Sequence, residues 1–179
     1  MEDNISQHFL ETTIKVFALY KKEAEGAMAQ LSEQELFYAP TPESNSVAVI
    51  AKHLWGNMLS RWTDFLTSDG EKDWRDRDSE FEAADIKTKA ELIKKWEEGW
   101  ACMFNALNPL TPADLARKVY IRGEEYTVLR AMQRQLAHYS SHIGQIVYVA
   151  KMIKGKGWNT LSIPKGKSKE FNQQMFGKK

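Results

Sequence analysis

The sequence contains only one cysteine, Cys102, so the chain cannot form an internal disulfide. A small secreted scaffold held together by several disulfides is therefore excluded. Charged residues interrupt every apolar stretch after a few positions, and none approaches the roughly 20 residues that a membrane-spanning helix needs. The N-terminus has neither the basic start nor the apolar run of a secretory signal. We therefore expect a cytoplasmic protein that does not bind a membrane.

An excess of charge of one sign is also lacking, because 25 Lys and Arg residues are balanced by 24 Asp and Glu residues. The formal net charge is +1, which gives the chain no general attraction to nucleic acid. The sequence contains no Gly-x-Ser-x-Gly elbow and no glycine-rich phosphate loop. We expect the ligand to be a small molecule and not a nucleic acid.

The length of 179 residues fits one domain over positions 1–179, and 42% of the residues are hydrophobic. Apolar side chains recur at three- and four-residue steps, which predicts four long helices at residues 5–31, 47–66, 89–107 and 128–154. Thr88 and Thr127 are candidate N-caps of the last two, and Gly155 is a candidate C-cap. Four amphipathic helices of this length predict an all-α fold, namely a four-helix bundle.

The connection between the second and third predicted helices is long and acidic. Residues 68–85 contain eight acidic and three basic residues. We interpret this loop as a solvated crossover in preference to a mobile functional segment. Residues 119–127 predict a small hairpin that turns at Arg122 and Gly123. The tail over residues 151–179 has eight lysines and one glutamate, and we expect it to be solvated and partly non-helical.

The candidate metal ligands are three of the four histidines. His138 and His142 are four residues apart, so both imidazoles lie on one face of the last predicted helix. His53 lies beside the apolar stripe of the second predicted helix, in line with Asn57 and Arg61. If these two helices are neighbours, three imidazoles converge and leave a coordination position open, as in catalytic zinc sites. Imidazole also accepts nickel, iron and manganese, so the metal is not specified.

Each histidine also has a structural interpretation. Taken alone, the His138/His142 pair fits surface residues or core residues whose hydrogen bonds are satisfied, and His53 alone fits a structural role better. No Asp or Glu is spaced on either helix to complete a site, so the metal prediction depends on all three histidines together. Asn57, Arg134 and Gln145 are polar and lie near the helical faces of the ligands. We therefore predict that these three residues bind the substrate.

Two segments resemble the DinB/YfiT-like superfamily of metalloenzymes. One is Ala-Lys-His-Leu-Trp-Gly-Asn at 51–57, and the other is Leu-Ala-His-Tyr-Ser-Ser-His-Ile-Gly-Gln-Ile at 136–146. The loop at 69–81 and the tail at 162–168 look like those of a bacterial branch with no assigned function. The resemblance covers nearly the whole chain. It implies a four-helix bundle, commonly a homodimer, with a divalent metal held by His53, His138 and His142.

Three functions remain open at this point. The superfamily includes enzymes that use low-molecular-weight thiols, so the first hypothesis is a metal-dependent enzyme, and specifically a thiol S-transferase acting on small electrophiles. The second hypothesis is a bundle that binds a metal or a small ligand without catalysis, for example in a stress response. The third is a structural bundle that dimerises and whose histidines only satisfy hydrogen bonds in the core.

Overall fold

A computed structural model of the protein describes residues 5–82 and 85–177. Most of this part of the chain is helical. The four long helices are α1 (Ile5–Ala29), α3 (Val47–Trp62), α4 (Lys89–Leu107) and α5 (Val128–Lys154). The shorter elements are α2 (Glu33–Phe37), the 3-10 helices η1 (Asp78–Phe81), η2 (Pro112–Ala116) and η3 (Gly155–Gly157), the strands β1 (Lys118–Ile121) and β2 (Glu124–Thr127), and α6 (Ser168–Phe176).

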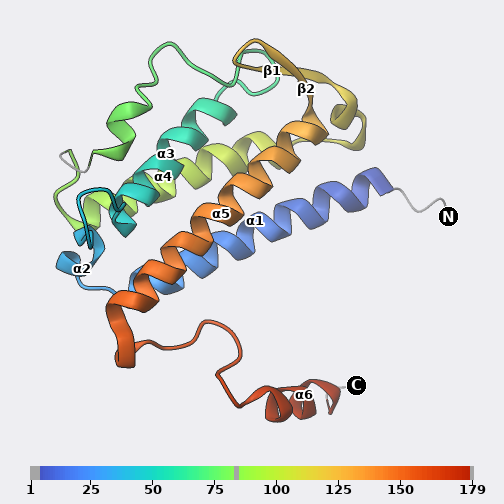
Figure 1. Ribbon diagram of the computed structural model, residues 1–179. Helices are drawn as coiled ribbons and strands as arrows, with labels where there is room; N and C mark the ends of the chain where they lie inside the picture. The colour runs from blue at the N-terminus through green and yellow to red at the C-terminus, as the bar shows by residue number, and fades with distance from the viewer. Residues whose placement is uncertain (1–4, 83–84, 178–179) are drawn as a thin grey trace.

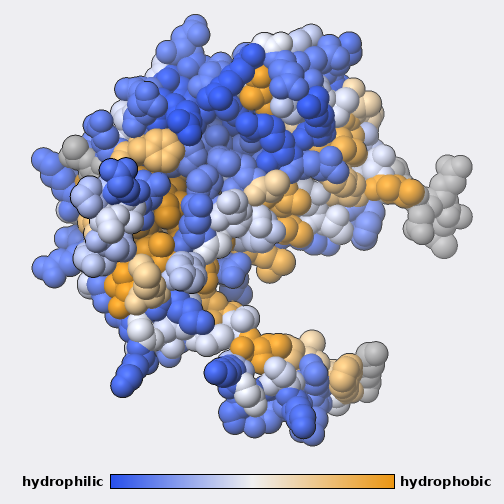
Figure 2. Space-filling view, viewed as in Figure 1, coloured by the Kyte–Doolittle hydropathy of each residue, from blue (hydrophilic) through white to orange (hydrophobic). Residues whose placement is uncertain are grey.

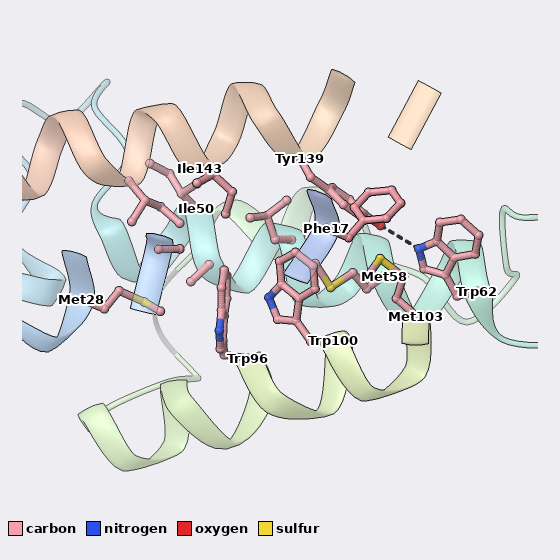
Figure 3. Close-up of a cluster of buried hydrophobic side chains, with 14 of the residues drawn as sticks. Phe17, Met28, Ile50, Met58, Trp62, Trp96, Trp100, Met103, Tyr139 and Ile143 are labelled. Carbon is pink, nitrogen blue, oxygen red and sulfur yellow. Dashed lines mark hydrogen bonds between the residues drawn. The ribbon is translucent and has the colours of Figure 1, made fainter. Parts of the chain in front are cut away.

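The four long helices surround one apolar core (Figure 1). Helix α3 lies between α4 and α5, and α1 packs mainly against α5. Figure 3 shows aromatic and methionine side chains from these helices meeting in the core. Its largest fully buried members include Phe17, Trp96, Trp100, Met103 and Tyr139. Because α3 and α5 pack on each other through this core, the histidines that the sequence singles out come from neighbouring helices.

The predicted ends of α4 and α5 are confirmed, and so are their caps. The Thr88 hydroxyl accepts a hydrogen bond from the Glu91 N–H at 3.2 Å, and the Thr127 hydroxyl accepts one from the Arg130 N–H at 3.1 Å. Gly155 follows α5 with φ +52°. The two threonine hydroxyls thus satisfy N–H groups of the first helical turn. Gly155 caps α5 as predicted, but its ψ of −119° lies outside the left-handed helical region.

Two other predicted helix ends are wrong by a few residues. The second helix was predicted over residues 47–66, but α3 ends at Trp62. Asp64 has φ +49°, and this left-handed conformation cannot continue a right-handed helix. The first helix was predicted over residues 5–31, but α1 ends at Ala29. The apolar stripe continues past both ends because the following turns also bury side chains in the core, as Phe65 does.

The predicted hairpin is confirmed, since β1 and β2 pair in antiparallel register. Arg122 and Gly123 form its turn with φ of +56° and +74°, as a two-residue turn with two left-handed positions requires. The Asp69 carboxylate accepts hydrogen bonds from the backbone N–H groups of Arg122 and Gly123 at 2.8 and 2.7 Å. These hydrogen bonds therefore hold the loop that follows α3 against the turn of the hairpin.

The C-terminal segment leaves the four long helices, and α6 lies apart from them (Figures 1 and 2). Phe171, Met175 and Phe176 of α6 are exposed. The lysine-rich tail thus contains both the expected non-helical stretch and one helix. Over residues 5–82 and 85–177, none of the helices combines the length and the apolar character that crossing a bilayer requires.

Candidate metal centre

Three histidines meet where α3 packs on α5. His53 belongs to α3, and His138 and His142 belong to successive turns of α5. Nε2 of His138 lies 3.3 Å from Nε2 of His53 and 3.1 Å from Nε2 of His142. One ring nitrogen of each histidine lies within 4.8 Å of the corresponding nitrogens of the other two. The predicted convergence of the three imidazoles is therefore present in the structure.

These separations fit a divalent cation. Imidazole nitrogens lie about 2.0–2.1 Å from a tetrahedral zinc ion, so two such ligands are separated by about 3.3–3.4 Å. The observed distances of 3.1 and 3.3 Å between Nε2 atoms are close to that value. Three nitrogen ligands on one side of an ion leave a further coordination position open. The three histidines could therefore hold a metal and still admit a ligand.

Outer hydrogen bonds orient two of the three imidazoles. Nδ1 of His53 lies 2.8 Å from Oε2 of Glu80, and Nδ1 of His142 lies 2.8 Å from Oε1 of Gln145. When each Nδ1–H donates to its oxygen, the Nε2 lone pair is directed at the common point, as in carboxylate–histidine–metal arrangements. Nδ1 of His138 is buried and has no hydrogen-bond partner within residues 5–82 and 85–177.

The imidazoles on α5 are held in the neutral form. Burial lowers the pKa of His138 to about 3, and the neighbouring His142 and His53 act in the same direction. Burial also lowers the pKa of His142 below its usual range. Because a histidine must be deprotonated to bind a metal, both residues are in the metal-binding state at neutral pH.

The loop between α3 and α4 contributes an acidic residue that the sequence analysis missed. Glu80 of η1 is 4% exposed and accepts hydrogen bonds from Nε and Nη2 of Arg75 at 2.7 and 2.9 Å, in addition to its contact with His53. Burial acts to raise the pKa of the Glu80 carboxyl. Its hydrogen bonds with His53 and Arg75 outweigh this effect, and the pKa lies below its usual range. Glu80 is therefore an anion between two donors.

The interpretation of this loop as a solvated crossover is wrong for part of residues 68–82. Residues 73–74 and 76–78 are exposed, but Gly70 and Glu80 are buried. Residues 83–84 lie outside the described chain. Lys52 is 5% exposed, and its Nζ donates to the carbonyl oxygens of Ser79 and Glu82 at 2.6 Å each. The Phe81 ring stacks on the His53 ring with centroids 4.8 Å apart. One sequence signal was available, because Lys52 interrupts an otherwise apolar stretch of α3 and a buried lysine needs partners.

The absence of a side chain at Gly56 allows this close approach of the loop to α3. A Cβ at this position would lie 2.5 Å from Oε1 and 2.8 Å from Cδ of Glu80. We expect Gly56→Ala to lower the free energy of unfolding by about 1–3 kcal/mol, because Glu80 must move away from its donors. Urea denaturation measures this change.

Gly144→Ala provides the matched control. Gly144 lies within α5, and beyond the backbone of the helix itself no atom of the described residues lies within 4 Å of the added Cβ. We expect this substitution to raise the free energy of unfolding by up to about 1 kcal/mol, since alanine favours a helix more than glycine does. Equal stabilisation by both substitutions would show that the loop does not pack tightly on Gly56.

The three histidines border a cavity of about 200 Å³. Asn57, Phe81, Arg134 and four further arginines complete its lining. Oδ1 of Asn57 accepts hydrogen bonds from Nε2 of Gln135 at 2.6 Å and from the Tyr139 hydroxyl at 3.3 Å, so its side chain is fixed. Two of the residues predicted to bind substrate, Asn57 and Arg134, thus border the cavity. The third, Gln145, lies behind His142.

No curated protein matches the chain at a significant level. A sequence model for a protein family of unknown function, DUF1572, matches residues 4–167, which is most of the chain. The matched region includes all three histidines and the loop that contacts them. The chain belongs to the DUF1572 family of proteins of unknown function.

Proposed function

We propose that the chain is a DinB-like four-helix bundle and a metal-dependent enzyme, with its metal held by His53, His138 and His142. The observation that supports this proposal is the convergence of three imidazoles. One ring nitrogen of each lies within 4.8 Å of those of the other two, and Nε2 of His138 lies 3.3 and 3.1 Å from Nε2 of His53 and His142. Zinc, nickel, iron(II) and manganese are the candidate ions. When bound, such a cation lowers the pKa of a thiol or a water molecule in its open position and so supplies a nucleophile at neutral pH.

The residues of the chain orient the metal ligands and form the substrate cavity. Glu80 holds the Nδ1 proton of His53, which keeps the lone pair of Nε2 directed at the metal position. The Phe81 ring covers one face of His53 and excludes water from it. Asn57 and Arg134 border the cavity next to the histidines and are proposed to contact the substrate.

The reaction that we propose is the transfer of a low-molecular-weight thiol to a small electrophile. The thiol sulfur forms a bond to the electrophilic carbon as the bond from that carbon to its leaving group breaks. A halide departs with the electron pair and the thiol proton passes to solvent; an epoxide oxygen keeps the electron pair, stays on the product and takes up a proton. This reaction rests on the resemblance to thiol-dependent members of the DinB/YfiT-like superfamily. A purely structural role for the histidines is less well supported, because His138 Nδ1 is buried without a partner in the described residues.

Thiol consumption by metal-loaded protein tests the proposal. Protein loaded with each candidate ion is offered cysteine, glutathione or coenzyme A together with 1-chloro-2,4-dinitrobenzene or an epoxide. We expect thiol consumption that depends on the metal and that falls by at least about tenfold in His138→Ala, which lacks one ligand. Equal rates for the two proteins would contradict the proposal.

The same experiment tests the alternative function. Protein that binds metal tightly but consumes no thiol with any pair of reagents would support a metal- or ligand-binding role without catalysis. His8→Ala is the control variant, because His8 lies exposed on α1, outside the metal centre.

A further inference from the structure

Five arginines line the cavity beside the three histidines, namely Arg61, Arg75, Arg77, Arg122 and Arg134. They come from separate parts of the chain: α3, the loop after it, the hairpin turn and α5. This end of the molecule is densely hydrophilic on the face shown in Figure 2. Metal ligation accounts for none of these guanidinium groups, because they are always protonated and donate only.

Two carboxylates neutralise only part of this charge. Oε2 of Glu71 lies 3.0 Å from Arg61, 3.1 Å from Arg122 and 3.4 Å from Arg75. Glu80 accepts from Arg75 as well and also contacts His53. Three guanidinium groups therefore share these two carboxylates, and the Asp69 carboxylate also acts on Arg61. The five arginines of the cavity still outnumber these three anions.

The remaining two arginines have no buried carboxylate partner in the described part of the chain. Nη1 of Arg134 donates to Oε1 of Gln135, a neutral amide, at 2.7 Å. Arg77 lies 3.9 Å from Asp78, whose side chain is 99% exposed, and its guanidinium packs over the Phe81 ring. Arg134 and Arg77 therefore border the cavity with N–H groups that are not hydrogen-bonded to any buried carboxylate of the described residues.

Arg61, a buried residue of the cavity lining, pairs with Glu71 but keeps one unmatched donor. Arg61 is 3% exposed, and its Nε has no hydrogen-bond partner within the described residues. Burial lowers the pKa of the Arg61 guanidinium. Glu71 acts to raise it, and the positive charges of Arg75 and Arg134 act in the same direction as burial. Grouped cations around a small cavity repel one another, and a bound anion relieves that repulsion.

We propose that the molecule on which the metal centre acts carries an oxyanion group, a carboxylate or a phosphonate, that Arg134 and Arg77 bind in this cavity. The fork of a guanidinium group matches the paired oxygens of either anion. A cavity of about 200 Å³ fits a small acid. This inference rests on the proposed function, since the anionic group is assigned to its substrate, and it adds the chemical class of that substrate.

Calorimetric titration of the full-length protein with methylphosphonate, acetate and neutral dimethyl methylphosphonate tests the inference. Each probe is titrated into zinc-loaded protein and into protein stripped of metal with a chelator. We expect one or both anions to bind both forms and the neutral ester to bind neither. Preference for methylphosphonate or for acetate identifies the anionic group of the substrate.

Charge-removing variants assign the binding to the cavity. We expect Arg134→Gln and Arg77→Gln each to weaken anion binding by about tenfold or more, the effect of one charged hydrogen-bond donor. Arg130→Gln is the matched control and should leave binding unchanged. Arg130 lies one turn before Arg134 on α5, pairs with Glu124 and does not line the cavity.

Several outcomes would overturn the inference. These are absence of anion binding to either form, equal binding by Arg134→Gln and Arg130→Gln, and binding that needs zinc and is insensitive to both cavity arginines. The last outcome would mean that the anion binds the metal directly. These outcomes can be distinguished from failure of the proposed function. Anion binding to metal-free protein that depends on the arginines requires neither a metal centre nor turnover.

Discussion

His138→Ala is expected to reduce the metal content of the purified protein from about one ion per chain to near background. His138 is the middle residue of the proposed ligand set, with its Nε2 3.3 Å from that of His53 and 3.1 Å from that of His142. Its removal leaves two imidazoles, fewer than the three protein ligands that a catalytic zinc site typically has. Elemental analysis of tag-free wild-type and variant proteins, each reloaded with zinc and desalted, measures the change.

Thermal unfolding provides a second readout of the same site. An ion that binds only the native state at 100 times its dissociation constant stabilises the protein by about 2.7 kcal/mol. We therefore expect a chelator to lower the melting temperature of wild-type protein and of His8→Ala, which keeps the site. The melting temperature of His138→Ala should not respond to the chelator.

The result also separates the metal hypothesis from the structural one. If the histidines only completed hydrogen bonds in the core, His138→Ala would lower stability by an ordinary amount, about 0.5–3 kcal/mol, with or without chelator. Retention of one ion per chain by His138→Ala would place the metal elsewhere in the protein.

The helices and the histidine cluster could be predicted from the sequence because their signals are local. Helix α5 begins after Thr127 and ends before Gly155, and both residues act through contacts within a few positions of the chain. The His138/His142 pair lies on one face for the same reason, since residues four apart on a helix are neighbours. His53 could be added because its position beside an apolar stripe indicates the face that meets another helix.

The rest of the site could not be predicted in this way because its contacts are not periodic. Glu80 lies 27 residues from His53, in a loop whose eight acidic residues look alike in sequence. Only the folded arrangement shows that Glu80 is buried while Asp78, two residues earlier, is exposed. The cavity arginines are equally dispersed along the chain, and a net charge of +1 conceals their clustering.

Glu80→Ala is the second substitution with a large expected effect. The Arg75 side chain is 2% exposed, and Glu80 accepts from it at 2.7 and 2.9 Å. Loss of the carboxylate leaves the buried guanidinium with Glu71 at 3.4 Å as its remaining ion-pair partner among the described residues. Breaking a buried ion pair by removing one partner costs about 3–5 kcal/mol, and we expect the free energy of unfolding of metal-free protein to fall by that amount. Urea denaturation measures it.

Glu82→Ala is the control for this measurement. Glu82 is exposed, and the contact with Lys52 uses its backbone oxygen, which the substitution retains. We expect a change within about 0.5 kcal/mol. Joint replacement in Glu80→Leu/Arg75→Met should destabilise the protein less than Glu80→Ala alone, because no buried charge is then left without its partner. Equal stability of Glu80→Ala and Glu82→Ala would contradict the assigned role of the buried pair.

Metal affinity distinguishes a positioning role of Glu80 from a purely structural one. Glu80 fixes the Nδ1 proton of His53, and loss of such an outer hydrogen bond typically lowers metal affinity by about 10–100-fold. Competition with a chromogenic chelator measures zinc affinity independently of stability. It is carried out without urea, at a temperature where both proteins are folded. Gly56→Ala should lower the affinity in the same direction, since it displaces the same carboxylate. Zinc affinity unchanged in Glu80→Ala would restrict Glu80 to holding Arg75 and the loop in place.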